Sequence, residues 1–154
     1  MIRVGLGYDS HRFEDGRKLV LGGVEFPGER GLKGHSDADV LVHAVIDALL
    51  GAAGLGDIGG HFPDTDPKFK DADSMALLQS VVAELEAGGW KIGNIDATLI
   101  CERPKIASRK AEMIASLEAV LKCPASIKGK TNEKMDDIGA GLGIAAMCVA
   151  LIER

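Results

Sequence analysis

The chain has 154 residues, of which 46% are hydrophobic and 27% are charged, as expected for a globular protein with a single domain over residues 1–154. A net charge of −5 and the absence of any basic stretch argue against nucleic-acid binding. The three cysteines, Cys101, Cys123 and Cys148, include no CxxC pair, so the sequence favours neither a disulfide framework nor a cysteine-rich zinc site.

The sequence carries no sign of a membrane or secretory segment. The first residues, MIRVGLGYDSHRF, lack a signal-peptide pattern. The longest apolar stretch, Gly139–Ile152, is shorter than the roughly 20 residues that a helix needs to cross a bilayer. We therefore expect a cytoplasmic protein that does not bind membranes.

The first third of the chain predicts strands followed by a helix. The expected elements are a strand over Ile2–Tyr8, a second over Lys18–Phe26 with a bulge or turn at Gly22-Gly23, a loop over Gly28–Gly34, and a helix over Ala38–Ala53 with Ser36 as its N-cap and Gly54 at its end. The helix is predicted because apolar residues recur every three or four positions in this segment.

The remainder alternates between helices and strands. We expect a broken polar loop over Leu55–Pro67, then a helix that Ser74 caps and that runs through Ala87 and ends at Gly88-Gly89. A strand over Ile95–Ile100, a helix over Ala107–Lys122 and a strand over Ala125–Lys130 follow. Gly139–Ile152 fits either a helix or a strand, because its periodicity does not decide between them. The mixture favours an α+β or α/β fold.

Three residues are candidates for a metal site. Asp9 and His11 are two positions apart, so on an extended segment they face the same side. His43 lies on the predicted helix between Asp39 and Asp47, each four residues away and on the same helical face. Asp9, His11 and His43 would offer zinc three ligands and leave a fourth position open, while Asp39 and Asp47 would fix the tautomer of His43. The alternative interpretation is that Asp9 lies in a turn, His11 is a surface histidine and His43 is a core histidine without a metal.

Two polar segments are candidates for substrate binding. Asp57–Asp66 combines acids with glycines and a proline, and such a loop can bind a polyol through its carboxylates and a phosphate through its glycine N–H groups. Lys128–Lys134 offers donors for phosphate and one carboxylate for a hard cation, although its spacing is not that of a P-loop. Solvated turns are the alternative in both cases. No GxSxG motif or Cys–His pairing supports nucleophilic catalysis.

Five segments together resemble the 2-C-methyl-D-erythritol 2,4-cyclodiphosphate synthase family over essentially the whole chain. They are GYDSHRF, HSDADVLVHAVIDALLGAAGLGDIG, HFPDTDPKFKDADS, NIDATLICERPKI and IKGKTNEKMDDIGAGLGIAAMCVALI, in this order. The resemblance implies a homotrimer with active sites between subunits. Each subunit would be α+β and ferredoxin-like, with a mixed four-stranded sheet, helices on one face and Gly139–Ile152 as a strand. It also implies metal-dependent cyclisation of 4-diphosphocytidyl-2-C-methyl-D-erythritol 2-phosphate with release of CMP.

The resemblance also implies roles for individual residues. Asp9, His11 and His43 would hold zinc, and Glu133 would hold a second cation, magnesium or manganese. The residues that match substrate positions are Asp57, Gly59 and Asp64 for the methylerythritol part, His35 and Ser36 for a phosphate-side loop, and Pro104, Lys105, Ile106, Gly129 and Thr131 for the cytidine and diphosphate pocket of the neighbouring subunit. Of these, Thr131 and His35, together with Glu133, would act in catalysis.

Three positions depart from the family pattern. Asp137 and Ala140 stand where well-known members carry an aromatic residue and an arginine, and that arginine is associated with a ligand on the threefold axis. Its absence puts binding of that ligand, proposed to be an isoprenoid diphosphate, in question. Arg103 replaces a small residue at the rim of the nucleotide pocket. The alternatives to a cyclising lyase are a zinc phosphohydrolase and a non-catalytic trimeric binding protein.

Overall fold

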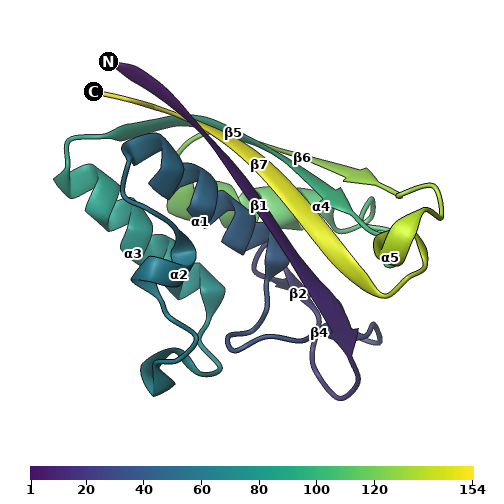
Figure 1. Ribbon diagram of the computed structural model, residues 1–154. Helices are drawn as coiled ribbons and strands as arrows, with labels where there is room; N and C mark the ends of the chain where they lie inside the picture. The colour runs from purple at the N-terminus through teal and green to yellow at the C-terminus, as the bar shows by residue number, and fades with distance from the viewer.

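Two layers make up the fold in the computed structural model, which describes all residues from 1 to 154. One layer is a mixed sheet with the strand order β4-β1-β7-β5-β6, and the other consists of helices that cover one of its faces (Figure 1). The strands are β1 (Ile2–Glu14), β4 (Gly31–Leu32), β5 (Lys91–Ile100), β6 (Ala125–Lys130) and β7 (Gly143–Glu153). β7 pairs antiparallel with both β1 and β5, whereas β5 and β6 are parallel. The fold is therefore of the expected α+β kind, with a mixed sheet.

Three long helices and several short elements complete the chain. The long helices are α1 (Val40–Ala53), α3 (Ser74–Ala87) and α4 (Lys110–Leu121). The short elements are the hairpin of β2 (Val20–Leu21) and β3 (Val24–Glu25), the single turns α2 (Ile58–His61) and α5 (Asp136–Gly139), and the 3₁₀ turn η1 (Pro67–Phe69). The expected broken loop before α3 thus contains α2 and is followed by η1.

The strands differ from expectation mainly in their limits. β1 continues past Tyr8 because it pairs with β7 without interruption from Ile2 to Arg12. β7 begins at Gly143, so the strand implied by the resemblance is confirmed for most of its predicted range, although its first residue, Gly139, ends α5. The segment expected as one strand before the first helix is instead the β2–β3 hairpin, which turns at Gly22-Gly23. The two-residue β4 adds a fifth strand to the four expected.

Both predicted serine caps are wrong. The carboxylate of Asp39 caps α1 by accepting the N–H three residues further on, at 3.1 Å, and Ala38 before it has a left-handed φ of 59° that a helix cannot include. Asp73 caps α3 in a similar way, and Ser74 is the first residue of that helix. The next predicted helix likewise starts late, at Lys110. The predicted helix ends at Gly54 and Gly88 are confirmed.

Helix α1 lies directly against β1, and two glycines permit this approach. A Cβ atom at Gly7 would lie 1.9 Å from the carbonyl oxygen of Ala44, and one at Gly5 would lie 1.9 Å from that of Ala48. No side chain larger than hydrogen fits between the two backbones. The helix and the strand that carry the candidate metal ligands are therefore in backbone contact.

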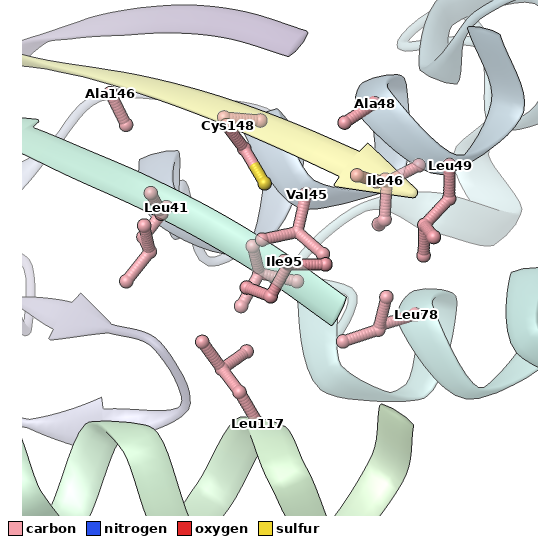
Figure 2. Close-up of a cluster of buried hydrophobic side chains, with 14 of the residues drawn as sticks. Leu41, Val45, Ile46, Ala48, Leu49, Leu78, Ile95, Leu117, Ala146 and Cys148 are labelled. Atoms are coloured by element: carbon pink, nitrogen blue, oxygen red, sulfur yellow. The ribbon is translucent and has the colours of Figure 1, made fainter. Parts of the chain in front are cut away.

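The core fills the space between the sheet and the helices. Figure 2 shows part of it, where side chains of α1 meet Leu78 of α3, Ile95 of β5, Leu117 of α4 and Cys148 of β7. The buried hydrophobic cluster contains 37 residues, and it joins the sheet to all three long helices. It holds α1 against β5 and β7, and β1 is in turn paired with β7 along its length.

The other face of the sheet is exposed and apolar. Every second residue of β1 points outwards there, and two residues of β7 lie beside them. We call this set the apolar sheet face; it consists of Ile2, Val4, Leu6, Tyr8, Met147 and Val149, each at least 40% exposed. An isolated chain would leave this surface in contact with water, at a cost that burial against another surface removes.

Candidate functional site

β1 and α1 bring the three candidate metal ligands together. The Asp9 carboxylate oxygen Oδ2 lies 2.8 Å from His11 Nε2 and 3.0 Å from His43 Nδ1, and the two ring nitrogens are 3.3 Å apart. Asp9 and His11 share one face of β1, as their spacing predicted. The side chains are 26%, 19% and 10% exposed for Asp9, His11 and His43, so the cluster is shielded but reachable from solvent.

The donor set suits a metal ion. One carboxylate and two imidazoles are nitrogen and oxygen ligands of the kind that zinc takes in catalytic sites, where a fourth position stays open. His11 Nδ1 lies 2.7 Å from the carbonyl oxygen of Lys33, which can only accept, so the ring is protonated at Nδ1. In the neutral ring, His11 Nε2 therefore carries a lone pair that points at the cluster. The residues present fit a divalent cation.

The electrostatics of the cluster also favour a cation. Burial alone would raise the pKa of Asp9, but hydrogen bonds and charge interactions with His11 and His43 outweigh it and lower this pKa to about 2. Burial lowers the pKa of His11, yet the hydrogen bond and the charge of Asp9 raise it above its usual value overall. Asp9 thus stays ionised at neutral pH and supplies a negative charge within the cluster.

The acids that were expected to support His43 do something else. The buried Asp39 carboxylate accepts the N–H groups of Gly22 and Gly23 at 2.9 and 2.7 Å, besides capping α1, so it anchors the β2–β3 turn. Asp47 accepts the N–H of Ile58 at 2.8 Å and fixes the start of α2. Neither carboxylate forms a hydrogen bond with the His43 ring. Helical spacing had placed them on the right face, but their partners come from other segments.

A cavity of about 400 Å³ opens over the metal ligands and gathers several predicted substrate residues. His35, Ser36, Gly59 and Asp64 line it together with Asp9, His11 and His43, and Ile58, Phe62, Phe69 and Leu77 add apolar wall. Asp57 is not part of this lining, because its carboxylate caps α2 through the N–H of Gly60 at 2.8 Å. Pattern reasoning missed the apolar wall, since isolated hydrophobic residues in a polar loop gave no periodic signal.

A second cavity, of about 210 Å³, gathers the residues predicted for the nucleotide. Pro104, Lys105, Ile106, Gly129 and Thr131 all line it, and Cys101, Ala107, Lys110 and Lys130 complete it. Lys110, which contributes a positive charge, was not predicted. Arg103 is paired with Glu29 at 3.0 Å outside this cavity.

Glu133, the predicted ligand of the second cation, lines neither of the two cavities within one chain. It lies in an exposed turn with a left-handed φ of 52°, and Lys134 after it has a φ of 60°. The carboxylate of Glu102 accepts the N–H of Lys134 at 2.8 Å and holds this turn. The turn follows β6 and precedes α5, which contains Asp137 and ends just before Ala140.

The cysteines do not form a second chemical centre. All three are free and buried. Burial raises the pKa of the Cys101 and Cys123 thiols to about 11 and that of Cys148 to about 12. Thiols in this state are poor nucleophiles at neutral pH, in agreement with the sequence.

Comparisons with known proteins agree with this site. The model of the YgbB family matches residues 2–153. The 2-C-methyl-D-erythritol 2,4-cyclodiphosphate synthase of Dechloromonas aromatica is 56% identical over 155 residues, which cover 99% of this chain and 97% of the relative. The bifunctional IspDF of Campylobacter jejuni is 40% identical with a TM-score of 0.95 over 99% of this chain, which spans 42% of that longer protein. A CDP-bound 2C-methyl-D-erythritol-2,4-cyclodiphosphate synthase is 38% identical with a TM-score of 0.89, over 98% of this chain and 100% of that one.

None of the helices combines the length and apolar character that crossing a membrane requires. The family model extends over almost every residue, and the Dechloromonas relative is more than half identical along its whole length. The chain therefore belongs to the YgbB family, together with the proteins named 2-C-methyl-D-erythritol 2,4-cyclodiphosphate synthase.

Proposed function

We propose that this chain converts 4-diphosphocytidyl-2-C-methyl-D-erythritol 2-phosphate into 2-C-methyl-D-erythritol 2,4-cyclodiphosphate and CMP, a step of non-mevalonate isoprenoid precursor synthesis. The observation that carries the proposal is the convergence of Asp9, His11 and His43 at a cavity that also contains the predicted polyol and phosphate residues. It occurs in a chain that is 56% identical over its length to a protein named for this reaction.

The reaction exchanges one P–O bond for another. An oxygen of the 2-phosphate attacks the β-phosphorus of the diphosphate, and the bond from that phosphorus to the oxygen of CMP breaks. The attacking phosphate monoester has a second pKa near 6, so it is largely ionised at neutral pH and needs no general base. Because both phosphates belong to one molecule, correct folding of the substrate supplies an effective molarity of roughly 10⁵–10⁸ M.

Asp9, His11 and His43 would hold one divalent cation, proposed to be zinc, and Glu133 a second, magnesium or manganese. The repulsion between two phosphate charges about 4 Å apart is roughly 4 kcal/mol at an effective dielectric constant near 20. When bound, such cations act as Lewis acids that neutralise this charge and template the phosphates. Asp9 contributes the negative charge that keeps a cation between its carboxylate and the two rings.

The chain's own residues would orient the substrate. Gly59 and Asp64 are placed to hold the polyol against the apolar wall of Phe62 and Phe69. Asp57 would join them once its carboxylate exchanges the N–H of Gly60 for a substrate hydroxyl. His35 is held by the carbonyl oxygen of Asp66, 3.0 Å from its Nε2, and would act on the phosphate side with Ser36.

The nucleotide would occupy the cavity of about 210 Å³. Its backbone edge at Pro104–Ile106 and Gly129 is suited to a flat cytosine ring. Lys105 and Lys110 offer positive charge, and the Thr131 hydroxyl a hydrogen bond, to the diphosphate. One solved relative carries the printed description of a CDP-bound form, which supports this assignment.

We further propose a homotrimer of ferredoxin-like subunits with active sites between them. Two features support it. The metal cluster and the nucleotide cavity have no lining residue in common within one chain, and a substrate that must reach both can do so if one cavity comes from a neighbour. The apolar sheet face provides a surface for such neighbours to bury.

A ³¹P NMR time course with zinc and magnesium, repeated with a chelator, tests the function. We expect the cyclic diphosphate and CMP, and loss of both on chelation. His43→Ala should abolish turnover in a folded trimer, while His61→Ala, which alters a histidine outside the cavity lining, should retain it.

The alternatives give different spectra. CMP with an open-chain diphosphate, and ¹⁸O from solvent in the product, would indicate a phosphohydrolase. Tight binding without turnover in a zinc-loaded protein would indicate a binding protein. Cyclisation that is insensitive to chelation, or normal in His43→Ala, would contradict the metal assignment.

A further inference from the structure

The metal-facing ring of His43 is backed by a chain of two side chains from separate segments. His43 Nε2, on the side of the ring away from Asp9, lies 2.8 Å from the hydroxyl oxygen of Ser74. The Ser74 hydroxyl in turn donates to the carboxylate of Asp37. Neither Asp37 nor Ser74 was predicted to have a role at the metal site, although both lie in the quoted segments HSDAD and DADS.

We propose that Asp37 and Ser74 are positioning residues that keep the proton of His43 on Nε2, so that Nδ1 is free to bind the cation. The inference rests on the proposed role of His43 as a ligand. It concerns which tautomer the ring adopts, which the three ligands alone do not determine.

The direction of the hydrogen bonds follows from donor and acceptor chemistry. An ionised carboxylate can only accept, so the hydroxyl proton of Ser74 points to Asp37. The oxygen of Ser74 is left as an acceptor, and its partner must be an N–H of His43 Nε2. The Ser36 hydroxyl lies 3.2 Å from the same nitrogen, and its oxygen, which accepts the N–H of Ala38, has a second lone pair that can share the Nε2 proton.

Backbone contacts prevent Asp37 from turning away. Its carboxylate accepts the N–H of Ser74 at 3.0 Å on one oxygen and that of Asp39 at 3.1 Å on the other. Its own N–H donates to the carbonyl oxygen of Ala72 at 3.0 Å. Asp37 therefore ties the segment before α1 to the start of α3, and both carboxylate oxygens are required as acceptors.

The hydrogen bonds from His43 to Ser74 and from Ser74 to Asp37 are shielded from water, so a reversal of their donor and acceptor roles would be costly. Ser74 is fully buried and His43 is 8% exposed. In such surroundings a misdirected hydrogen bond has no water to replace it. Asp9 Oδ2, 3.0 Å from His43 Nδ1, would accept a proton placed on that nitrogen and so competes with Ser74 for the tautomer of the ring. A proton on Nδ1 would occupy the place of the cation. Partners of this kind affect metal affinity by roughly 10–100-fold in other proteins.

Asp37→Asn is the sharpest test, because asparagine keeps the shape of the aspartate side chain and replaces one of its two acceptor oxygens by an NH2 donor. One carboxylate oxygen of Asp37 accepts both the Ser74 hydroxyl and the N–H of Asp39, and the other accepts the N–H of Ser74. An amide nitrogen in the first place donates to the Ser74 hydroxyl and frees it to donate to His43 Nε2, whereas an amide nitrogen in the second place leaves the hydroxyl bond intact, so Asp37→Asn is read together with Ser74→Ala. The matched control is Asp73→Asn, the same substitution on the other side of Ser74, where the side chain caps α3 and asparagine caps equally well. Ser74→Ala removes the link itself.

Two measurements decide the matter. Zinc affinity is measured by competition with a chromophoric chelator, and the protonated nitrogen of His43 by long-range ¹H–¹⁵N NMR on metal-free protein at a pH where the rings are neutral. In the unaltered protein and in Asp73→Asn we expect Nε2–H and equal affinities. In Asp37→Asn we expect a shift towards Nδ1–H and a roughly 10–100-fold loss of zinc affinity.

The results separate this inference from the proposed function. Nδ1–H in the unaltered protein would overturn the inference whether or not zinc binds. So would unchanged affinity and tautomer in both Asp37→Asn and Ser74→Ala, or a lost affinity with His43 still protonated at Nε2, since the effect would then be structural. A protein that binds no zinc but carries Nε2–H would overturn only the metal assignment. If Ser74→Ala fails to fold, Asp37→Asn alone decides.

Discussion

Gly7→Ala should disturb the contact on which the metal cluster depends. The added Cβ would lie 1.9 Å from the carbonyl oxygen of Ala44, whereas real Cβ contacts are essentially never shorter than 3.0 Å. The strand and the helix must therefore separate by at least about 1 Å. Both contacting groups are backbone, so no side chain can rotate away. Overpacking of a core ordinarily costs about 1–3 kcal/mol, and we expect a loss of unfolding free energy of about 3 kcal/mol or more here.

The same separation should weaken the metal site. Asp9 lies two residues beyond Gly7 on β1, and His43 lies next to Ala44 on α1, so the displacement passes directly to the ligands. Metal–ligand distances tolerate deviations of only about 0.2 Å. We therefore expect the zinc affinity of Gly7→Ala to fall at least about tenfold, in line with the effect of weaker disturbances around metal ligands.

Denaturant unfolding of the metal-free protein and chelator competition test the two expectations. Gly51→Ala is the matched control, because it makes the same change on α1 at a position with no atom within 4 Å. It should stabilise the protein by up to about 1 kcal/mol through helix propensity and leave zinc affinity unchanged. A Gly7→Ala protein that matches the unaltered protein within about 0.5 kcal/mol and binds zinc equally well would refute the reasoning.

Three further predictions concern other parts of the molecule. Burial raises the pKa of Asp39 to about 6 from 3.8, so the folded chain holds its proton more tightly than the unfolded chain. The unfolding free energy should therefore fall by roughly 2 kcal/mol between pH 4 and pH 7 relative to Asp39→Asn, and urea titrations that show a constant difference would contradict this. Glu102→Ala removes the acceptor that holds the turn of the proposed second-cation ligand. It should raise the magnesium concentration for half-maximal activity several-fold without changing zinc content, whereas Glu112→Ala should change neither. Leu6→Asp puts a charge on the apolar sheet face and should convert the proposed trimer to monomers in light scattering, while Ala115→Asp, on the exposed side of α4, should not. A trimer in both variants would exclude this face as the interface.

The sequence predicted those parts of the site that depend on local geometry. Asp9 and His11 share a face because the side chains of a strand alternate, and this holds in any sheet. That His43 meets them depends on which helix lies on which strand, and periodicity carries no such information. The resemblance supplied it. A physical signal was nevertheless present, since Gly5 and Gly7 leave one face of the strand without side chains, which marks a close approach of another backbone.

The errors have a common physical origin. Asp39 and Asp47 were assigned to His43 because helical spacing gives a shared face, but hydrogen bonds to backbone N–H groups of distant turns claimed both carboxylates. Ser36 and Ser74 were chosen as caps beside aspartates that cap equally well, and local chemistry does not rank such neighbours. The limits of β1 and the addition of β4 were set by pairing partners rather than by propensity.

The contact of α1 with the glycines of β1 also means that the metal site forms when the chain folds, before a cation binds. In a zinc finger the cation organises the chain, so folding and loading are one event. Here the core packs α1 against β7, β1 is hydrogen-bonded to β7, and α1 and β1 are in direct backbone contact. Folding alone therefore brings the ligand atoms together, and the metal-free protein already has a preformed cation site. A cation that leaves can be replaced without refolding, so the supply of metal in the surroundings governs the fraction of active molecules.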